Sequence, residues 1–300
     1  MKNQHVEYLK RQDSIFWFIG LITMAFAMIT LFSLVVDMAI TGWPRITAEF
    51  FTSFPSRFPE KAGILSAWVG SLCVVFVTAI ISIPIGVASG IYLEEYAAKN
   101  IFTKVIEINI LNLAAIPSIT FGLMALGIFV YKMDLGQTII TAGLTLGLLI
   151  LPIIIVTTRE AIRTIPAHIR EASYSLGATK WQTIWNHILP YSSGGVMTGV
   201  VIALSRAIGE TAPLITVGAL TFIAFLPSSP IIEHVPYISM KWLSDPYTVM
   251  PIQMFNWVSR PQEEFHVNAA AAGLVLLTMT LVLNAAAIYI RYRFRRKYKW

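Results

Sequence analysis

Long apolar segments alternate with short polar stretches along this chain. A helix needs roughly 20 consecutive apolar residues to cross a bilayer core of about 30 Å. Six segments reach that length, at residues 15–40, 63–91, 105–131, 138–158, 191–225 and 266–290. The pattern predicts an all-α, polytopic membrane protein with six transmembrane helices. We expect the first segment to be retained, because it is too long for the core of a cleavable signal peptide.

Smaller signals lie within and between these segments. Gly86 and Gly90 form a small-xxx-small pair that favours close helix packing. The connections 41–62 and 226–265 are rich in proline and aromatic residues, and we interpret both as loops. The first of these loops has the composition to pack on the outer surface.

The composition agrees with a membrane protein and narrows the possible functions. Hydrophobic residues make up 56% of the chain and charged residues 13%, which is unlike a soluble domain. The single cysteine, Cys73, excludes an internal disulfide. The five histidines lack metal-ligand spacing, and no G-x-x-x-x-G-K-[ST] motif is present to hold a nucleotide phosphate. We therefore expect no cofactor, metal or catalytic residue in this chain.

Lysine and arginine are distributed unevenly between the two sides of the predicted membrane. Of the 22 such residues, 15 lie on the side that carries both termini and six on the other side. Because positive residues favour the cytoplasmic side, both termini are predicted to be cytoplasmic. The net charge of +6 then requires no nucleic-acid partner, since the basic tail 291–300 is suited to anionic membrane lipid.

A polar segment at 159–190 separates the fourth and fifth apolar segments. Pro166 suits the first turn of a helix, and Gly177 is placed to end that helix in a left-handed cap. Thr179 and Gln182 form a capping box that starts a second short helix. The segment is thus predicted to be helix–turn–helix with an apolar surface formed by Tyr174, Leu176, Trp181, Ile184 and Trp185.

The polar segment resembles the coupling motif of ABC-importer permeases, E-A-A-x3-G-x9-I-x-L-P. The residues that carry the resemblance are Glu171, Ala172, Gly177, Leu189 and Pro190. Two positions depart from the motif: Ser173 stands at its third residue, and His187 stands where isoleucine is usual. The resemblance implies that this loop docks in a cleft of a separate ATPase subunit. Without the resemblance, the segment would be an ordinary amphipathic cytoplasmic loop.

The fifth apolar segment contains an arginine and a glutamate. On a helical wheel, Gly199, Ala203, Arg206, Glu210 and Pro213 fall within about 80° of one another. Arg206 lies roughly 22 Å along the helix, deep in the bilayer, where an arginine costs about 2.5–3.5 kcal/mol on insertion scales. It therefore needs a partner or a watery path, and Glu210 is one helical turn away.

Two interpretations of this pair remain open on physical grounds. In the structural interpretation, Arg206 and Glu210 only neutralise each other and hold helices together. In the functional interpretation, they line an anion path, because a guanidinium offers bidentate donors and a permanent charge to a phosphate-like oxyanion. Glu210 would moderate the attraction so that the anion is not trapped.

The run R-A-I-G-E-T-A-P-L at 206–214 resembles the signature of PstA-type permeases of phosphate-specific ABC importers. Segments 86–96 and 255–257 and Asn284 agree, and the resemblance spans about 63–296. It implies a type I ABC importer permease fold. The N-terminal part, 1–62, would hold a cytoplasmic segment, the first transmembrane helix and an outer loop. The permease core would occupy 63–290, with the coupling loop at 159–190.

This resemblance also implies a role and partners. The chain would be a non-catalytic permease subunit for inorganic phosphate in a bacterial inner membrane, with Arg206, Glu210 and Thr211 in the substrate path. The implied partners are a PstC-type permease, two PstB-type ATPase subunits that bind ATP and Mg, and a PstS-type phosphate-binding protein. The alternatives are a permease for sulfate or molybdate, an ion-coupled carrier working alone, or a membrane scaffold without transport.

Overall fold

The computed structural model describes residues 2–231, 237 and 239–297, and the regular elements in these ranges are helices. The predicted all-α class is confirmed. Among the described residues, five helices are long and apolar enough to cross a membrane, and a bent helix pair adds a sixth crossing if it counts as one span. The long helices are α1 (Lys2–Gly42), α3 (Leu65–Ile91), α6 (Ile139–Arg163), α9 (Leu189–Gly209) and α12 (Glu263–Lys297).

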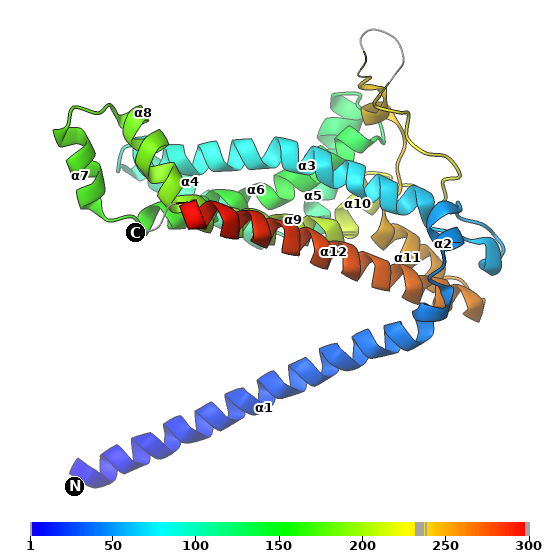
Figure 1. Cartoon of the computed structure of the whole chain (residues 1–300), viewed down its shortest axis with the longest axis horizontal. Coiled ribbons are helices and arrows are strands. Elements are labelled where there is room, and N and C mark those ends of the chain that lie inside the picture. Colours follow the sequence, from blue (N-terminus) through cyan, green and yellow to red (C-terminus); the bar gives the residue numbers. More distant parts are fainter. Residues whose placement is uncertain (1, 232–236, 238, 298–300) are drawn as a thin grey trace.

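Helices α3, α6, α9 and α12 form a bundle, whereas α1 diverges from it at a wide angle (Figure 1). α1 meets the bundle at its C-terminal end, where Gly42 lies against the backbone of Ala270 and Ala271 in α12. The beginning of α1, the end of α12, and the short helices α7 (Ala167–Ser175) and α8 (Lys180–Thr183) lie at the same end of the molecule.

Glycines allow the central helices to touch. A Cβ atom at Gly86 would lie 2.7 Å from Ile154, and one at Gly90 would lie 2.7 Å from Thr158, so both glycines of α3 pack directly on α6. The predicted small-xxx-small contact is therefore present between these two helices. α9 approaches α6 from another side through Gly199. α6 is thus the central helix, with side chains buried along most of its length.

The third apolar segment is not the single helix expected over 105–131. It is divided into α4 (Ile101–Ala115) and α5 (Ser118–Ala125), the latter continued by a π-helical segment to Lys132, with a bend of 103° between the two parts. Pro117 explains the break. A proline disfavours helical geometry in the preceding residue, and Ile116 is extended, with φ −69° and ψ 136°.

The fifth apolar segment, expected to be one helix over 191–225, is also broken. α9 ends at Gly209, Glu210 is extended, and the short helix α10 (Ala212–Thr216) follows. In a continuous helix, the nitrogen of Pro213 would have to donate to the carbonyl of Gly209, which a proline cannot do. The break falls where this hydrogen bond would be lost.

The connection 226–265 was expected to be a loop, and that expectation is wrong for its second half. It contains α11 (Met250–Val258), whose Trp257 is fully buried, and Tyr247 just before it is buried as well. The connection 41–62 contributes Phe50, from α2 (Ala48–Thr52), to the same apolar cluster as Trp257. These two connections therefore pack together and cover the bundle at the end opposite α7 and α8 (Figure 1).

Candidate functional site

The polar segment folds into two short helices joined by a tight turn, as its local sequence predicts. We call α7, the turn and α8 (residues 167–183) the coupling hairpin. Gly177 has φ +80°, the left-handed conformation that glycine adopts without strain. The amide of Ala178 donates to the carbonyl of Ser173, and that of Gly177 to Tyr174, which is a Schellman cap. The capping box of Thr179 and Gln182 is present at the start of α8.

One departure from the coupling motif has a structural role in the coupling hairpin. The hydroxyl of Ser173 on α7 is hydrogen-bonded to that of Thr183 on α8, 2.8 Å apart, and both residues are buried. The serine therefore joins the two helices. His187, the other departure, is exposed and packs no core. Leu189 and Pro190 form the first turn of α9, which continues from α8 through a π-helical turn.

The outer surface of the coupling hairpin is apolar and exposed. Leu176 is 89% exposed at the turn, and Trp181 stacks on Trp185 of the following π-helical turn with ring centroids 5.7 Å apart. Ile184, predicted to share this surface, is buried instead. The motif residues Glu171 and Ala172 are also exposed. Such a surface is suited to a protein partner, because covering an apolar patch with another protein surface lowers the free energy.

The polar segment begins later than its sequence suggests. α6 continues to Arg163, so Arg159 and Glu160 belong to a transmembrane helix rather than to the coupling loop expected at 159–190. Arg159 is buried and donates to Glu107 of α4 at 2.5 Å. Its charge is paired with Glu107, and with Glu94 at 3.6 Å, although its buried Nε has no hydrogen-bond partner in the described part of the chain. A paired arginine does not need a solvated loop.

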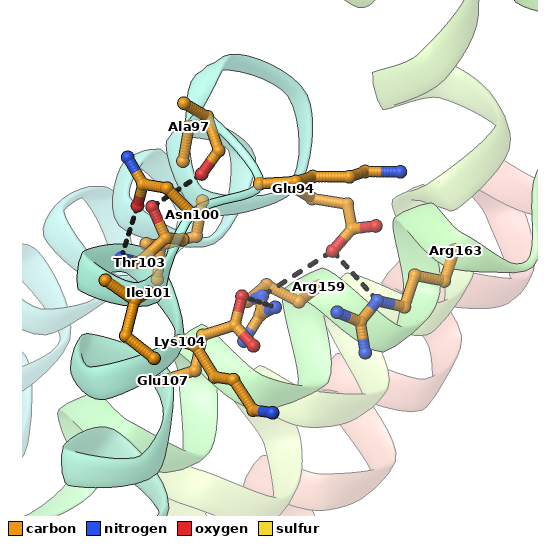
Figure 2. Close-up of a pocket in the computed structure, with 12 residues that line it drawn as sticks. Glu94, Ala97, Asn100, Ile101, Thr103, Lys104, Glu107, Arg159 and Arg163 are labelled. Carbon is orange, nitrogen blue, oxygen red and sulfur yellow. Dashed lines mark hydrogen bonds and ion pairs between the residues drawn. The ribbon is translucent and has the colours of Figure 1, made fainter.

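Arg159 lies at the edge of a cavity of about 500 Å³ between α4, α6 and the turn that follows α3 (Figure 2). Glu94, from that turn, accepts a hydrogen bond from Arg163 Nε at 2.9 Å and lies 3.6 Å from Arg159 Nε. Arg163 also pairs with Glu160 of its own helix, at 3.0 Å. These ion pairs join three separate segments of the chain at the end that carries the coupling hairpin.

Arg206 and Glu210 are brought together at the break between α9 and α10. Arg206 lies in the last turn of α9, and its Nε donates to Glu210 Oε1 at 3.1 Å. The arginine side chain is 38% exposed and the glutamate 17%. The terminal nitrogens of Arg206 have no hydrogen-bond partner among the described residues, so the guanidinium keeps free donors.

The predicted single face of small and charged residues is not continuous. Gly199 and Ala203 are buried in the bundle, whereas Arg206 is exposed and Pro213 belongs to the next helix. A single face requires one continuous helix, and α9 ends at Gly209. Thr211, the third predicted path residue, is half-buried and begins α10 without a side-chain cap.

Two hydrogen bonds to α12 hold α9 in place. Ser205, next to Arg206, donates to Asn284, and Arg291 donates to Thr198 at 2.7 Å. In the sequence, Asn284 is notable only as part of a resemblance. The sequence predicts no role for Glu94, Glu95, Tyr96, Glu107 and Arg170, although the opposite charges of these segments are a visible signal. Their partners lie too far away in the sequence to be paired without a structure.

The fold and the family of the sequence together identify the class of protein. The chain matches a chain of the MetNI methionine ABC transporter in an inward-facing conformation, with a TM-score of 0.58 over 75% of this chain and 93% of that one, at 17% identity. The architecture is that of an ABC-transporter permease, as expected. Residues 82–300 match the binding-protein-dependent transport system inner membrane component, and the chain belongs to this family.

Curated relatives match over nearly the whole chain. The phosphate transport system permease protein PstA of Haemophilus influenzae is 29% identical, over 98% of this chain and 99% of its own. PstA of Pasteurella multocida is 27% identical over the full length of both. The probable ABC transporter permease protein YqgI of Bacillus subtilis is 30% identical, over 89% of this chain and 90% of its own. The resemblance to PstA-type permeases is therefore confirmed.

Proposed function

We propose that this chain is the permease subunit of an ATP-driven importer of inorganic phosphate. Its full-length similarity to permeases named for phosphate transport supports the substrate. The observation that carries the proposal is the placement of Arg206, an exposed guanidinium with free donors at a break in a transmembrane helix. A guanidinium binds phosphate oxygens in a planar, bidentate manner.

Arg206 attracts the anion, and Glu210 limits the attraction. The carboxylate holds only Nε, so Nη1 and Nη2 are available to phosphate oxygens while one negative charge stays close by. Transport requires binding that is strong enough to admit the anion and weak enough to release it. Thr211 adds a hydroxyl at the start of α10, next to the pair. The three predicted path residues thus share one helix break.

The coupling hairpin is the dock for a separate ATPase subunit. Its rigid turn at Gly177, its buried Ser173–Thr183 link and its exposed tryptophan pair give a preformed apolar knob that fits a protein cleft. ATP and Mg bind to that ATPase, and this chain contributes no catalytic group or cofactor site. We assign it a PstC-type permease as its heterodimer partner, two PstB-type ATPase subunits, and a PstS-type phosphate-binding protein on the outer side.

The arrangement of the ends agrees with a cytoplasmic coupling side in the inner membrane. The beginning of α1 and the end of α12 lie at the end that carries the coupling hairpin (Figure 1). The excess of lysine and arginine on that side predicts that both termini are cytoplasmic. Cysteine-accessibility labelling tests this topology, and labelling of a cysteine at Lys180 from the outside would contradict it.

Uptake by the reconstituted complex tests the function. Proteoliposomes that hold this chain with its PstC-type, PstB-type and PstS-type partners should accumulate labelled phosphate only with ATP on the cytoplasmic side. Sulfate and molybdate, added in excess, should not compete. Competition by either would assign the other oxyanion instead, and phosphate uptake driven by an ion gradient without ATP would assign an ion-coupled carrier.

A further inference from the structure

We propose that three successive side chains, Glu94, Glu95 and Tyr96, transmit the movement of the coupling hairpin to α3. Glu95 and Tyr96 hold the hairpin itself, and Glu94 binds the end of α6 beside it. We call these three residues the E-E-Y turn. They belong to the π-helical segment η3 (Tyr92–Tyr96), which directly continues α3. The inference rests on the proposed function, because it assigns these residues a part in coupling to the ATPase.

Glu95 binds the first helix of the coupling hairpin. Its Oε1 accepts hydrogen bonds from Arg170 Nε at 3.0 Å and Nη2 at 2.7 Å, and its side chain is only 6% exposed. Arg170 also donates to the carbonyls of Ile165 at 2.8 Å and Ile162 at 3.3 Å. One guanidinium therefore connects α7, the end of α6 and the E-E-Y turn.

Tyr96 binds the second helix of the coupling hairpin. The Nζ of Lys180, the first residue of α8, lies 4.9 Å from the centroid of the Tyr96 ring, which is within cation–π range. Tyr92 stacks on Tyr96 with an interplanar angle of 8° and fixes the orientation of that ring. The tyrosine thus holds the end of the hairpin that Glu95 does not reach.

Glu94 binds the last turns of α6. It accepts a hydrogen bond from Arg163 and lies within ion-pair distance of Arg159 (Figure 2). Arg159 is in turn bound to Glu107 of α4. Three neighbouring side chains therefore contact three different elements: Glu94 contacts α6, Glu95 contacts α7, and Tyr96 contacts α8.

The helical geometry of the E-E-Y turn makes this arrangement possible. Successive side chains of a helix point in different directions around its axis, so consecutive residues can reach elements on different sides. π-helical segments are rare and often occur at functional sites. The chain itself connects the hairpin only to α6 and α9. The E-E-Y turn adds a direct, non-covalent connection to α3, which packs against α6 through Gly86 and Gly90.

The transmission can be separated from docking by measuring both in the complete complex. In Glu95→Gln, the side chain keeps its size but loses the charge that holds Arg170. We expect the ATPase subunits to be retained and ATP to be hydrolysed at near the wild-type rate. Phosphate transported per ATP should fall by about fivefold to tenfold, at the lower end of typical coupling between distant sites.

Glu160→Gln is the matched control. Glu160 is exposed and pairs only with Arg163 of its own helix, so the same chemical change removes no contact with the hairpin. The ratio of phosphate to ATP should stay at the wild-type value. If the proposed function were wrong, wild type and control would both lack ATP-driven phosphate uptake, whereas a failure of this inference alone leaves all three complexes equally active.

A second pair of variants keeps the test decisive if Glu95→Gln does not assemble. Tyr96→Leu removes the aromatic face that Lys180 contacts without unpairing a buried charge, and Tyr96→Phe retains that face. We expect the transport ratio to fall in the leucine variant and to stay near wild type in the phenylalanine variant. Equal ratios in both, or loss of ATPase retention together with uptake in the leucine variant, would show a merely structural role and overturn the proposal.

Discussion

Arg159 and Arg206 both lie in the C-terminal part of a transmembrane helix and both pair with glutamate, but their surroundings differ. The Arg159 side chain is 8% exposed and lies between two carboxylates from other segments, Glu94 and Glu107. The Arg206 side chain is 38% exposed and has one carboxylate, four residues further along its own chain. The first arginine is enclosed by its partners, and the second retains an open side.

The difference separates two uses of the same residue pair. An enclosed ion pair fixes the relative positions of the helices that carry it, because removing one partner leaves a buried charge. An exposed guanidinium with free donors is instead available to a ligand. Arg159 lies at the end with the coupling hairpin, and Arg206 at the helix break inside the membrane segment. Under the proposed function, Arg159 fixes the packing of the helices at the coupling end, and Arg206 binds the anion elsewhere in the bundle.

The largest effect is expected from removing the enclosed arginine. Arg159→Gln leaves Glu94 and Glu107 close together without their shared partner, and should lower the free energy of unfolding by about 3–5 kcal/mol. Thermal unfolding of the purified permease complex measures this. Adding Glu107→Gln should restore part of the stability. If Arg159→Gln were as stable as wild type but inactive in uptake, Arg159 would belong to the transport path. The two arginines would then not differ in role.

Removing the open arginine should affect transport rather than assembly. Arg206→Gln should reduce phosphate uptake by about 100-fold, since hydrogen bonds to charged groups contribute about 1.5–3 kcal/mol each. The complex should still assemble and hold its ATPase. Arg206→Lys keeps the charge but loses the bidentate geometry of the guanidinium. Its phosphate uptake should lie between that of the wild type and that of Arg206→Gln. Uptake and subunit retention are measured on the same preparations.

The double variant Arg206→Gln with Glu210→Gln decides between the two interpretations of the pair. If the pair lines the anion path, the complex assembles and stays inactive. If the pair is only structural, the single change harms assembly and the double change restores both assembly and uptake. Full phosphate uptake by the double variant would end the anion-path interpretation.

A smaller effect, confined to the coupling end, is expected from Gly177→Val. No atom lies near an added Cβ there, so the penalty comes from the left-handed backbone alone and should be about 1–3 kcal/mol. The permease should insert normally while ATPase retention falls by about tenfold. Gly177→Asn is the control, because asparagine tolerates this conformation. Unchanged retention in the valine variant would contradict docking at this turn.

The smallest effect is expected from Glu160→Gln. The exposed pair of Glu160 with Arg163, three residues apart, should contribute less than about 0.5 kcal/mol to stability. Thermal unfolding of this variant should be measured in parallel with that of Arg159→Gln. The two positions are adjacent in sequence and differ in burial, so the measurement compares a buried ion pair with an exposed one. A loss as large as that of Arg159→Gln would mean that burial does not govern these pairs.

The parts of the fold that depend on local chemistry could be predicted. Gly177, Thr179 and Gln182 define their caps with residues a few positions apart, and the apolar segments follow from length alone. The break after Gly209 was also present in the sequence, as the Pro213 ring four residues later, but the apolar run through it suggested continuity. α11 could not be predicted, since its burial depends on Phe50, about 200 residues away.

The contacts of the candidate site also divide into local ones, which the sequence predicts, and distant ones, which it does not. Arg206 and Glu210 are four residues apart, so their pairing follows from sequence. Arg159 is bound by residues 52 and 65 positions earlier, and nothing local distinguishes it from a loop arginine. The contacts of the E-E-Y turn are equally non-local. Their chemistry was visible as opposite charges, but their partners depend on how α3, α6 and the hairpin pack.

The length of α1 relates this permease to the thickness of its bilayer. The apolar segment 15–40 extends for roughly 39 Å as a helix, which exceeds a hydrocarbon core of about 30 Å. Such a mismatch is relieved by tilting, and α1 does lie oblique to α12 in Figure 1. A thicker membrane allows the helix to stand more upright. The angle between α1 and the bundle is therefore expected to respond to lipid chain length, with the contact of Gly42 and Ala271 as its pivot.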